Sequence, residues 1–342
     1  MLKNEINIKK ISTDSNSSKS NYMLEVNNLK ISFYVPEGEV KAVNDITFKL
    51  KKGEIIGLVG ESGCGKSVTA LSILKLINPP GRIVSGDINY LKNNLISYSE
   101  KQMRVIRGKN ISMIFQDSMT SLNPLLSIGT QLSETILSHE KVSKSEAYKR
   151  SLQLLRETGI SSPETRVKEY PHQLSGGMRQ RVMISIALAC NPDVIIADEP
   201  TTALDVTIQA QILDLLKGLV LKNKISVIFI THDLSIIAEM CDRAIIMYAG
   251  KIVEEGQVFE IFEDPLHPYT KGLLGALPGD KKRGDKLFNI EGSVPVPINL
   301  PTGCLYFERC SNAEKGICDK VDPSLTQISE SHYVYCHKYN NS

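Results

Sequence analysis

Residues 55–67 read IIGLVGESGCGKS, and this stretch decides the fold. Its beginning, residues 55–59, is an apolar run typical of a buried parallel strand. The next residues, Gly60-Glu61-Ser62-Gly63-Cys64-Gly65-Lys66-Ser67, fit the phosphate-binding pattern G-x-x-x-x-G-K-S/T. A helix over residues 68–76 is expected to continue outward from this loop. Strand, loop and helix in this order predict a P-loop, and therefore a chain that binds ATP or GTP.

Each part of the predicted loop has a physical task. Glycines at positions 60, 63 and 65 let backbone N–H groups converge on the β-phosphate oxygens, and a Cβ atom there is expected to crowd the nucleotide. Lys66 supplies positive charge for the β- and γ-phosphates, and the hydroxyl of Ser67 suits Mg²⁺. Cys64 lies among the converging N–H groups, which are expected to lower the pKa of its thiol.

Two further apolar runs end in residues that suit phosphate hydrolysis. Residues 194–197 lead into Asp198 and Glu199, which places two carboxylates at the carboxyl end of a parallel strand. Asp198 suits Mg²⁺, and Glu199 is positioned to deprotonate the attacking water. Residues 225–230 lead into His232, whose imidazole can reach the γ-phosphate. A lone histidine after a strand is usually structural, but here all three strands are ordered to build one site.

The segment Leu174-Ser175-Gly176-Gly177-Met178-Arg179-Gln180-Arg181 lies upstream of these carboxylates. It closely resembles the signature of ATP-binding cassette (ABC) ATPases. Ser175, Gly176 and Gly177 can present a hydroxyl and bare N–H groups at the start of a helix over residues 178–190. The resemblance implies that this helix end caps the γ-phosphate held by the opposite subunit, so that two nucleotide sites lie at a dimer interface.

The same resemblance assigns roles to other positions. It implies that Gln116, after a strand over 111–115, senses Mg²⁺ and the attacking water and connects the site to a membrane partner. Ala203-Leu204-Asp205 resembles the loop that crosses to the other subunit, and His232 resembles the switch histidine. An aromatic residue near the start of the chain is expected to stack on adenine. We favour Phe33 over Tyr34 because residues 29, 31 and 33 alternate on one strand face, with a core aromatic as the alternative.

The fold class predicted from these motifs is α/β, a P-loop ABC ATPase. It would have a RecA-like mixed sheet core, an antiparallel β subdomain, an inserted helical subdomain and a small C-terminal cysteine-rich extension. Residues 1–22 are polar and predict a flexible segment, residues 23–262 the nucleotide-binding domain, and residues 263–342 the extension. The helical subdomain spans about 118–180, where residues 145–157 space Tyr148, Leu152 and Leu155 as a helix does. Residues 243–256 predict two short strands joined at Ala249-Gly250.

Two segments after residue 262 narrow the family. His267-Pro268-Tyr269-Thr270-Lys271-Gly272-Leu273-Leu274-Gly275-Ala276-Leu277-Pro278 and Ile290-Glu291-Gly292-Ser293-Val294-Pro295 together resemble the C-terminal extension of oligopeptide, dipeptide and nickel importer ATPases. The resemblance covers nearly all of residues 24–338.

Four of the seven cysteines, Cys304, Cys310, Cys318 and Cys336, lie close to the end of the chain. In a cytosolic chain this clustering favours a metal site over disulfides, because the cell keeps paired thiols reduced. Four thiolates can hold Zn²⁺ or a 4Fe-4S cluster, and the spacing does not choose between them. The motif resembles the iron–sulfur motif of peptide importer ATPases, with Ser311 where relatives often have proline. That resemblance implies a 4Fe-4S cluster with a structural or redox-regulatory role.

The composition limits what the chain can do alone. It has 342 residues, is 42% apolar and carries a net charge of +2, with charges interspersed, so nucleic acid is not an expected partner. The longest apolar stretch, residues 182–190, is far shorter than the about 20 residues of a membrane-spanning helix. Residues 1–22 lack the apolar core of a secretory signal. Any membrane function must therefore come from partner chains.

These observations predict the ATP-hydrolysing subunit of a bacterial ABC importer, with ATP and Mg²⁺ as cofactors, at the cytoplasmic face of the membrane. The expected partners are two transmembrane permease subunits, an extracytoplasmic substrate-binding protein and a second ABC ATPase subunit, in a heterodimer or alternatively a homodimer. The expected solutes are oligopeptides or dipeptides, with nickel or another small solute as the alternative. A soluble ABC ATPase of DNA repair or translation and a redox-sensing regulator are the alternatives of other classes. The single cassette and the transporter-type tail favour the importer.

Overall fold

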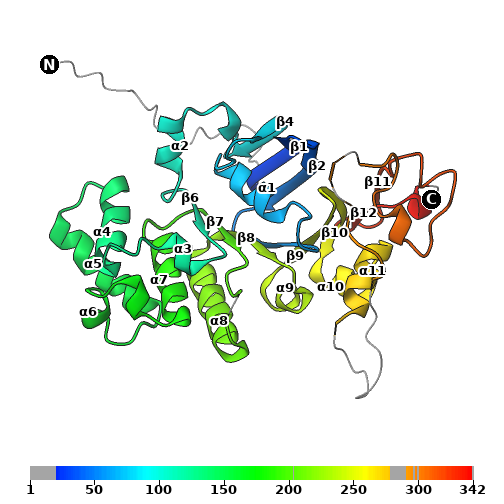
Figure 1. Cartoon of the computed structure of the whole chain (residues 1–342). Coiled ribbons are helices and arrows are strands. Elements are labelled where there is room, and N and C mark those ends of the chain that lie inside the picture. The colour runs from blue at the N-terminus through cyan, green and yellow to red at the C-terminus, as the bar shows by residue number, and fades with distance from the viewer. Residues whose placement is uncertain (1–20, 203, 278–289, 296, 299, 341–342) are drawn as a thin grey trace.

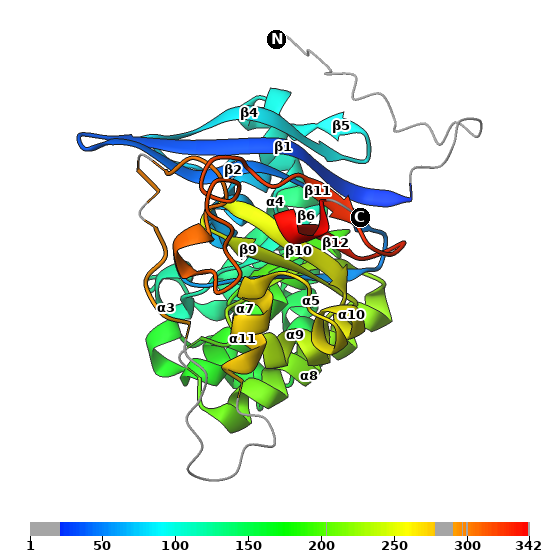
Figure 2. The same cartoon turned by 90° about the vertical axis from the view of Figure 1, so that its right-hand side faces the viewer.

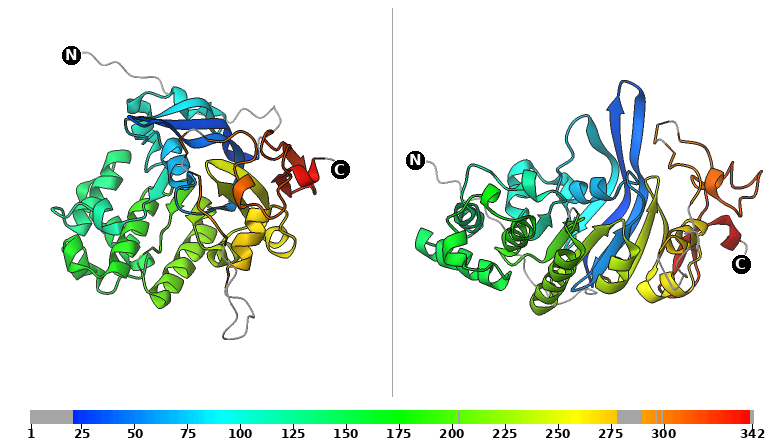
Figure 3. Two further views of the ribbon diagram at one scale, coloured as in Figure 1. Left: turned by 45° about the vertical axis from the view of Figure 1, so that its right-hand side comes forward. Right: turned by 60° about the horizontal axis from the view of Figure 1, so that its bottom comes forward.

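The computed structural model describes residues 21–340, apart from residues 203, 278–289, 296 and 299. Two β-sheets lie between a helical subdomain at one end of the molecule and the C-terminal extension at the other (Figure 1). A view from another side keeps this order (Figure 3). Most of the predicted N-terminal segment (residues 1–20), Ala203 and Pro278 lie outside the described residues.

The smaller sheet is antiparallel, as predicted for the β subdomain, with the strand order β2-β1-β4-β5. Leu24, Val26, Leu29 and Ile31 of the first strand are fully buried, and strand residues between them are more exposed, which is the pattern of a sheet with one face on the core. The strands are β1 (Tyr22–Val35), β2 (Gly38–Lys51), β4 (Gly81–Tyr90) and β5 (Asn93–Asn94).

The larger sheet has eight strands in the order β11-β12-β10-β9-β3-β8-β7-β6. Strands β9, β3, β8, β7 and β6 are parallel, and the three on the other side are antiparallel. The predicted apolar runs are confirmed as strands, since β3, β7, β8 and β9 are buried at every residue. The strands are β3 (Ile55–Val59), β6 (Ile111–Ile114), β7 (Val194–Asp198), β8 (Ser226–Thr231), β9 (Arg243–Tyr248), β10 (Lys251–Gln257), β11 (Leu325–Gln327) and β12 (Tyr333–Tyr335).

Alternate residues of these strands contribute to two separate cores. Ile55 and Val59 pack with the helices on one face, whereas Ile56 and Leu58 pack with the smaller sheet and the helix after the P-loop. The helices around the sheets are α1 (Lys66–Ile73), α2 (Glu100–Ile106), α7 (Gly176–Leu188), α8 (Val206–Asn223), α9 (Leu234–Met240), α10 (Val258–Glu263) and α11 (Pro268–Gly275). The central sheet is therefore covered on both faces.

The helical subdomain is confirmed between β6 and β7, where the structure contains no strand over residues 115–193, all of them described. Its helices are α3 (Ser118–Ser121), α4 (Ile128–His139), α5 (Lys144–Glu157) and α6 (Pro163–Arg166). The helix predicted over residues 145–157 is present as α5, but its buried face is not the row of residues that indicated it. Leu155 is buried, but Tyr148 is 39% exposed, and the packed row runs through Ala147 and Ser151. Small side chains occupy this face because α4 packs closely against it. The hydroxyl groups of Ser133 in α4 and Ser151 in α5 are 3.1 Å apart and form a hydrogen bond.

The C-terminal extension is joined to the cassette through the larger sheet. Strand β12 pairs with β10, and β11 with β12, so the end of the chain extends the core sheet (Figure 2). Glu254 of β10 is fully buried and accepts hydrogen bonds from the backbone N–H groups of Leu266 (2.7 Å) and His267 (2.8 Å). Its Oε1 atom also lies 2.8 Å from Nε2 of His332, just before β12. This carboxylate thus binds the beginning and the end of the extension to the same strand.

Candidate functional site

The phosphate loop lies between β3 and α1. Gly65 has a φ of 100°, and a Cβ atom there would lie 2.4 Å from the Ala42 carbonyl oxygen. At Gly60 the obstacle would be the Met247 carbonyl oxygen, at 2.2 Å. The glycines at these two positions are therefore required by the protein's own backbone, in addition to any nucleotide. Gly63, with a φ of 81°, has open space beside it, and Ser62 is exposed.

Lys66 begins α1 and turns its ammonium group into the loop. Its Nζ atom donates hydrogen bonds to the carbonyl oxygens of Gly60 (2.7 Å) and Glu61 (3.0 Å). It also lies 3.6 Å from the sulfur of Cys64. The lysine charge and the curled backbone are thus held as one unit, as the P-loop prediction requires.

The expectation for Cys64 is wrong. Its side chain is fully buried, and burial raises the pKa of the thiol although Lys66 acts in the opposite direction. The sequence pattern indicates N–H groups around this position, but it does not show that the sulfur points into the core beneath the loop. Only the Cys64 backbone is available to the phosphates.

Two of the residues proposed for Mg²⁺, Ser67 and Asp198, are in direct contact. The Ser67 hydroxyl donates a hydrogen bond of 3.0 Å to Oδ1 of Asp198, at the end of β7. Asp198 is 5% exposed, and burial raises the pKa of its carboxyl, partly offset by the bond from Ser67. An anionic carboxylate held in such a place is stabilised by a cation, so this hydroxyl–carboxylate set fits Mg²⁺.

Glu199 is the centre of a hydrogen-bond network that joins three strand ends. Gln116 Nε2, after β6, donates to its Oε2 at 2.9 Å, and His232 Nδ1, after β8, lies 3.1 Å from its Oε1. Burial alone would raise the pKa of Glu199, but the hydrogen bonds from His232 and Thr202 outweigh it and lower the pKa. Glu199 also has a φ of 45°, a strained conformation for this residue and one that is common at functional sites.

The two aromatic candidates for adenine face different surroundings. Phe33 is partly buried against the core of the smaller sheet, close to Gly81, where an added Cβ would meet its ring at 2.5 Å. Tyr34 is 40% exposed, and the Arg82 guanidinium lies 4.0 Å from its ring centroid. The choice of Phe33 stays a prediction.

The signature residues form an exposed helix start. Ser175 caps α7, and its hydroxyl accepts a hydrogen bond from the Met178 N–H at 3.4 Å. Asp205 caps α8 in the same way, through the N–H of Ile208 at 2.9 Å. A Cβ on Gly177 would lie 2.7 Å from the Ile208 side chain, so the two helix starts are neighbours. Ser175, Gly176 and Asp205 are all exposed, which leaves two positive helix ends on one surface.

The four clustered cysteines meet in the fold although they are spread along the chain. Cys304, Cys310, Cys318 and Cys336 all line one cavity of about 310 Å³ beside His267 and Tyr306. Gly303 makes this possible, because its φ of 80° brings the chain within contact of the Cys318 carbonyl, to which the Cys304 N–H donates at 2.8 Å. All seven cysteines are free. The thiols surround the cavity, and in the described part of the chain no three His, Cys, Asp or Glu side chains converge as they do around a single bound ion.

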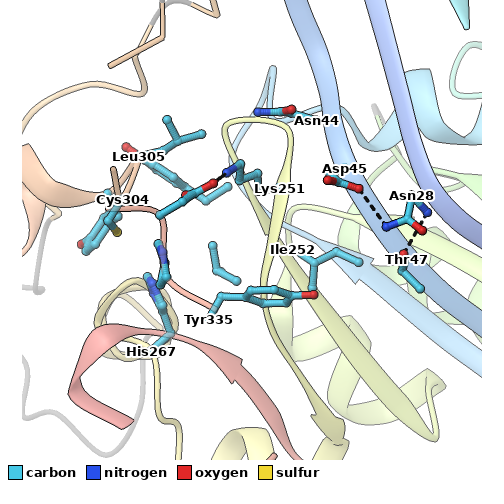
Figure 4. Close-up of a pocket in the computed structure, with 15 residues that line it drawn as sticks. Asn28, Asn44, Asp45, Thr47, Lys251, Ile252, His267, Cys304, Leu305 and Tyr335 are labelled. Atoms are coloured by element: carbon cyan, nitrogen blue, oxygen red, sulfur yellow. Dashed lines mark hydrogen bonds and ion pairs between the residues drawn. The ribbon is translucent and has the colours of Figure 1, made fainter. Parts of the chain in front are cut away.

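A second cavity of about 260 Å³ lies on the other side of Cys304, between the extension and the smaller sheet. Figure 4 shows Asn28, Asp45 and Thr47 on one wall and His267 and Cys304 on the other. This polar cavity and the cysteine cavity adjoin, since His267, Cys304 and Tyr306 line both.

Two contacts in the site are not predicted from the sequence. The Thr202 hydroxyl donates to Glu199 Oε2 at 2.9 Å, and its position three residues later could have indicated it. The Tyr269 hydroxyl accepts the Glu61 N–H at 2.9 Å across 208 residues, for which no local pattern exists.

The sequence matches two family models in succession. Residues 43–202 match the ABC transporter model, and residues 253–318 match the model of the oligopeptide/dipeptide transporter C-terminal region. The chain is 51% identical, over 92% of its length and 94% of the relative's, to the dipeptide transport ATP-binding protein DppD of Bacillus subtilis. It is 45% identical, over 93% of its length and 94% of the relative's, to the oligopeptide transport ATP-binding protein OppD of Salmonella typhimurium.

Solved structures match over the cassette. The dimeric ATP-binding cassette MJ0796, in a post-hydrolysis state bound to ADP and Pi, aligns with a TM-score of 0.63 and 28% identity. The alignment covers 69% of this chain and 99% of that one. CbiO1 of Clostridium perfringens, part of the transporter complex cbiONQ, aligns with a TM-score of 0.61 and 29% identity, covering 71% of this chain and 92% of that one.

Proposed function

The chain belongs to the ABC transporter family, among the oligopeptide and dipeptide transport ATP-binding proteins, and from this premise we propose how its residues drive uptake. It is an ATPase subunit of a peptide importer. No helix in the described residues is long and apolar enough to span a bilayer. We place the chain at the cytoplasmic face of the membrane, bound to two permease subunits, with an extracytoplasmic binding protein delivering the solute.

The phosphate loop binds and orients ATP. The backbone of Gly60, Glu61, Ser62, Gly63, Cys64 and Gly65 curls towards the N-terminus of α1, so its N–H groups and the Lys66 ammonium form the cationic cradle for the β- and γ-phosphates. Phe33 is proposed to cover the adenine ring. ATP, and not GTP, is the nucleotide in this assignment, as the names of the relatives indicate.

Ser67, Asp198 and Gln116 would hold Mg²⁺ at the end of β7. When bound, the ion supplies charge neutralisation for the β- and γ-phosphates. The support for this assignment is the hydroxyl–carboxylate contact of 3.0 Å between Ser67 and Asp198, which sets two oxygen ligands side by side.

Glu199 acts as the general base for the attacking water, and its network is the observation that carries the proposal. The carboxylate needs to be ionised and fixed in direction, and the bonds from Gln116 and His232 provide both. A carboxylate only accepts hydrogen bonds, so His232 donates from Nδ1 and its ring orientation is set by the base itself. Proton transfer to such a positioned base typically contributes about 10²–10⁴-fold to the rate.

A second cassette completes each site. The exposed helix start at Ser175, Gly176 and Gly177 would cap the γ-phosphate held by the partner's phosphate loop, and Asp205 would lie at the crossing loop. The dimeric state of the solved cassette MJ0796 supports this arrangement. We propose a heterodimer with a sister ATPase, with a homodimer as the second possibility.

We propose that the cysteine cavity holds a 4Fe-4S cluster, with Zn²⁺ as the alternative. The donor set fits, because four thiols from distant positions line the same cavity. The choice of the cluster over Zn²⁺ follows the resemblance of the cysteine motif to that of peptide importer ATPases. When bound, the cluster would supply a structural bond among the four chain segments and a one-electron redox site.

Reconstitution tests the transport role. The wild-type chain, its two permeases and a sister ATPase would be reconstituted in proteoliposomes with ATP in the lumen, and the binding protein and labelled solutes would be added outside. ATP-dependent accumulation of a dipeptide or an oligopeptide is expected, and Glu199→Gln should abolish it. Accumulation of nickel with no peptide uptake would select the alternative solute, and no ATP-dependent uptake of either would overturn the proposal.

A further inference from the structure

Glu61, the second residue of the phosphate loop, is held by three groups. Its carbonyl oxygen accepts from Lys66 Nζ at 3.0 Å, and its N–H donates to the Tyr269 hydroxyl at 2.9 Å. Its carboxylate binds Arg309 of the C-terminal extension through two parallel hydrogen bonds of 2.7 and 3.0 Å. Two of these three groups come from outside the cassette motifs, and neither contributes to phosphate chemistry directly.

The Arg309 guanidinium is also held by groups outside the phosphate loop. Its side chain is only 6% exposed. Its Nε atom donates to the Glu291 carbonyl at 3.0 Å, and its centre lies 5.7 Å and 5.9 Å from the ring centroids of Tyr248 and Tyr306. Planar stacking and a bidentate contact with a carboxylate are the two arrangements in which Lys does not replace Arg.

The contact between Arg309 and Glu61 also affects the position of Lys66, because the Glu61 carbonyl oxygen accepts a hydrogen bond from the Lys66 ammonium group. A displaced Glu61 would move the carbonyl oxygen to which Lys66 donates, and with it the N–H groups that converge on the β-phosphate. The Cys64 N–H, which donates to the Glu61 carbonyl at 3.3 Å, would move as well. The loop is short and rich in glycine, and the Tyr269 hydroxyl and the Arg309 guanidinium are the two groups of the extension that restrain Glu61.

We propose that Arg309 is a positioning residue for the nucleotide site, which holds the phosphate loop in its binding geometry through Glu61. This inference rests on the proposed ATPase function and adds to it a role for the extension. Arg309 ends the short helix Phe307–Arg309 and immediately precedes Cys310, so the residue that contacts the phosphate loop is next in sequence to one that lines the cysteine cavity. The extension is thereby a part of the ATP site.

Nucleotide affinity of the full-length chain tests the inference. Binding of a non-hydrolysable ATP analogue with Mg²⁺ would be measured by calorimetry for the wild type, Arg309→Met, Arg309→Lys, Glu61→Gln and the double variant Arg309→Met/Glu61→Gln. The control is Arg156→Met, which removes an exposed ion pair with Glu164 in the helical subdomain. Thermal unfolding without nucleotide would be recorded for each variant.

We expect Arg309→Met and Glu61→Gln each to weaken binding about tenfold, the order expected for a buried charge-assisted contact. The double variant should be no weaker than the single ones, Arg309→Lys should recover only part of the affinity, and Arg156→Met should match the wild type. If Arg309 served only to anchor the extension, its substitution would lower the unfolding temperature. The affinity for the ATP analogue would then stay within about twofold of the wild-type value, well short of the expected tenfold loss.

Such unchanged affinity, or losses that add in the double variant, would overturn the inference. If Arg309→Met does not fold, Glu61→Gln decides the same question from the other side of the contact. Absence of binding by the wild type would instead refute the proposed ATPase function, and the inference with it.

Discussion

Glu199 Oε1 lies 3.1 Å from Nδ1 of His232, while the other oxygen of the same carboxylate receives the Gln116 amide at 2.9 Å. The first contact comes from the end of β8 and the second from the end of β6, on either side of β7. The carboxylate of Glu199 is therefore connected to the strands on both sides of β7. Gln116 is the second residue after β6, at the start of the segment that leads into the helical subdomain.

Glu199→Gln should separate binding from hydrolysis. The amide keeps the size of the side chain but cannot take a proton, so turnover should fall about 10²–10⁴-fold while ATP stays bound. ATPase rate, bound nucleotide and the fraction of dimer on size-exclusion chromatography would be measured with the sister subunit present. A dimer that accumulates only with ATP is the expected result.

The pH dependence of this variant gives a second check. Hydrogen bonds from His232 and Thr202 lower the pKa of Glu199, so the base is already ionised near neutral pH. The ratio of wild-type to variant rates should thus be the same at about pH 6 and about pH 8, both above the usual carboxyl pKa of about 4.3. A ratio that collapses at the lower pH would mean that another group is the base.

Lys66→Ala should remove nucleotide binding itself. Lys66 is 5% exposed, and its ammonium group is fixed on the Gly60 and Glu61 carbonyls, so the substitution removes a positioned charge from the loop. We expect at least a tenfold rise in Kd for ATP, since a charged hydrogen bond contributes about 1.5–3 kcal/mol. Lys217→Ala, far along the sequence in α8, is the control, and equal affinity for both variants would contradict the cradle assignment.

The metal content of the extension should depend on its cysteines alone. Cys310→Ser/Cys318→Ser should lose iron by elemental analysis of anaerobically purified protein, together with the visible absorbance of an iron–sulfur cluster. Cys190→Ala removes a buried thiol outside the cavity and should keep both signals. Zinc in the wild type would replace the cluster assignment, and a wild type free of both metals would reject a metal site.

Glu254→Leu should release the extension from the cassette. The substitution leaves two backbone N–H groups and His332 without their buried acceptor, and loss of one partner in such a buried network costs about 3–5 kcal/mol. Thermal unfolding should shift down markedly, and limited proteolysis should cut within the extension first. Glu164→Leu, at an exposed site, should unfold like the wild type.

The sequence predicts the cassette well because its signals are local. Buried parallel strands such as β3 and β8 are continuous apolar runs, and the residue that each strand positions lies close behind it in the sequence. His232 comes directly after β8, and Lys66 follows β3 at the end of the phosphate loop. Side-chain direction is less accessible. The Cys64 thiol is expected to have a lowered pKa, but its side chain is fully buried, and burial raises that pKa. Tyr148 belongs to the helically spaced apolar residues of the sequence, yet it is 39% exposed.

The contacts between the extension and the cassette are not accessible from the sequence. Tyr269 and Arg309 reach Glu61 from 208 and 248 residues away, and neither belongs to a pattern that names its partner. The cysteine spacing shows that a cluster of thiols is present but not that Gly303 folds the chain back to bring Cys304 beside Cys318. Such long-range pairs depend on the whole topology.

The distance along the chain between Glu61 and Arg309 has a consequence for biosynthesis. At about 5–20 residues per second, the ribosome needs roughly 12–50 s after making Glu61 before Arg309 is polymerised. During that interval the nascent cassette has its lysine and its glycines but lacks the guanidinium that holds the loop, and the outer edge of β10 still awaits β12. Newly made chains are therefore expected to reach their full affinity for ATP only when translation is almost complete.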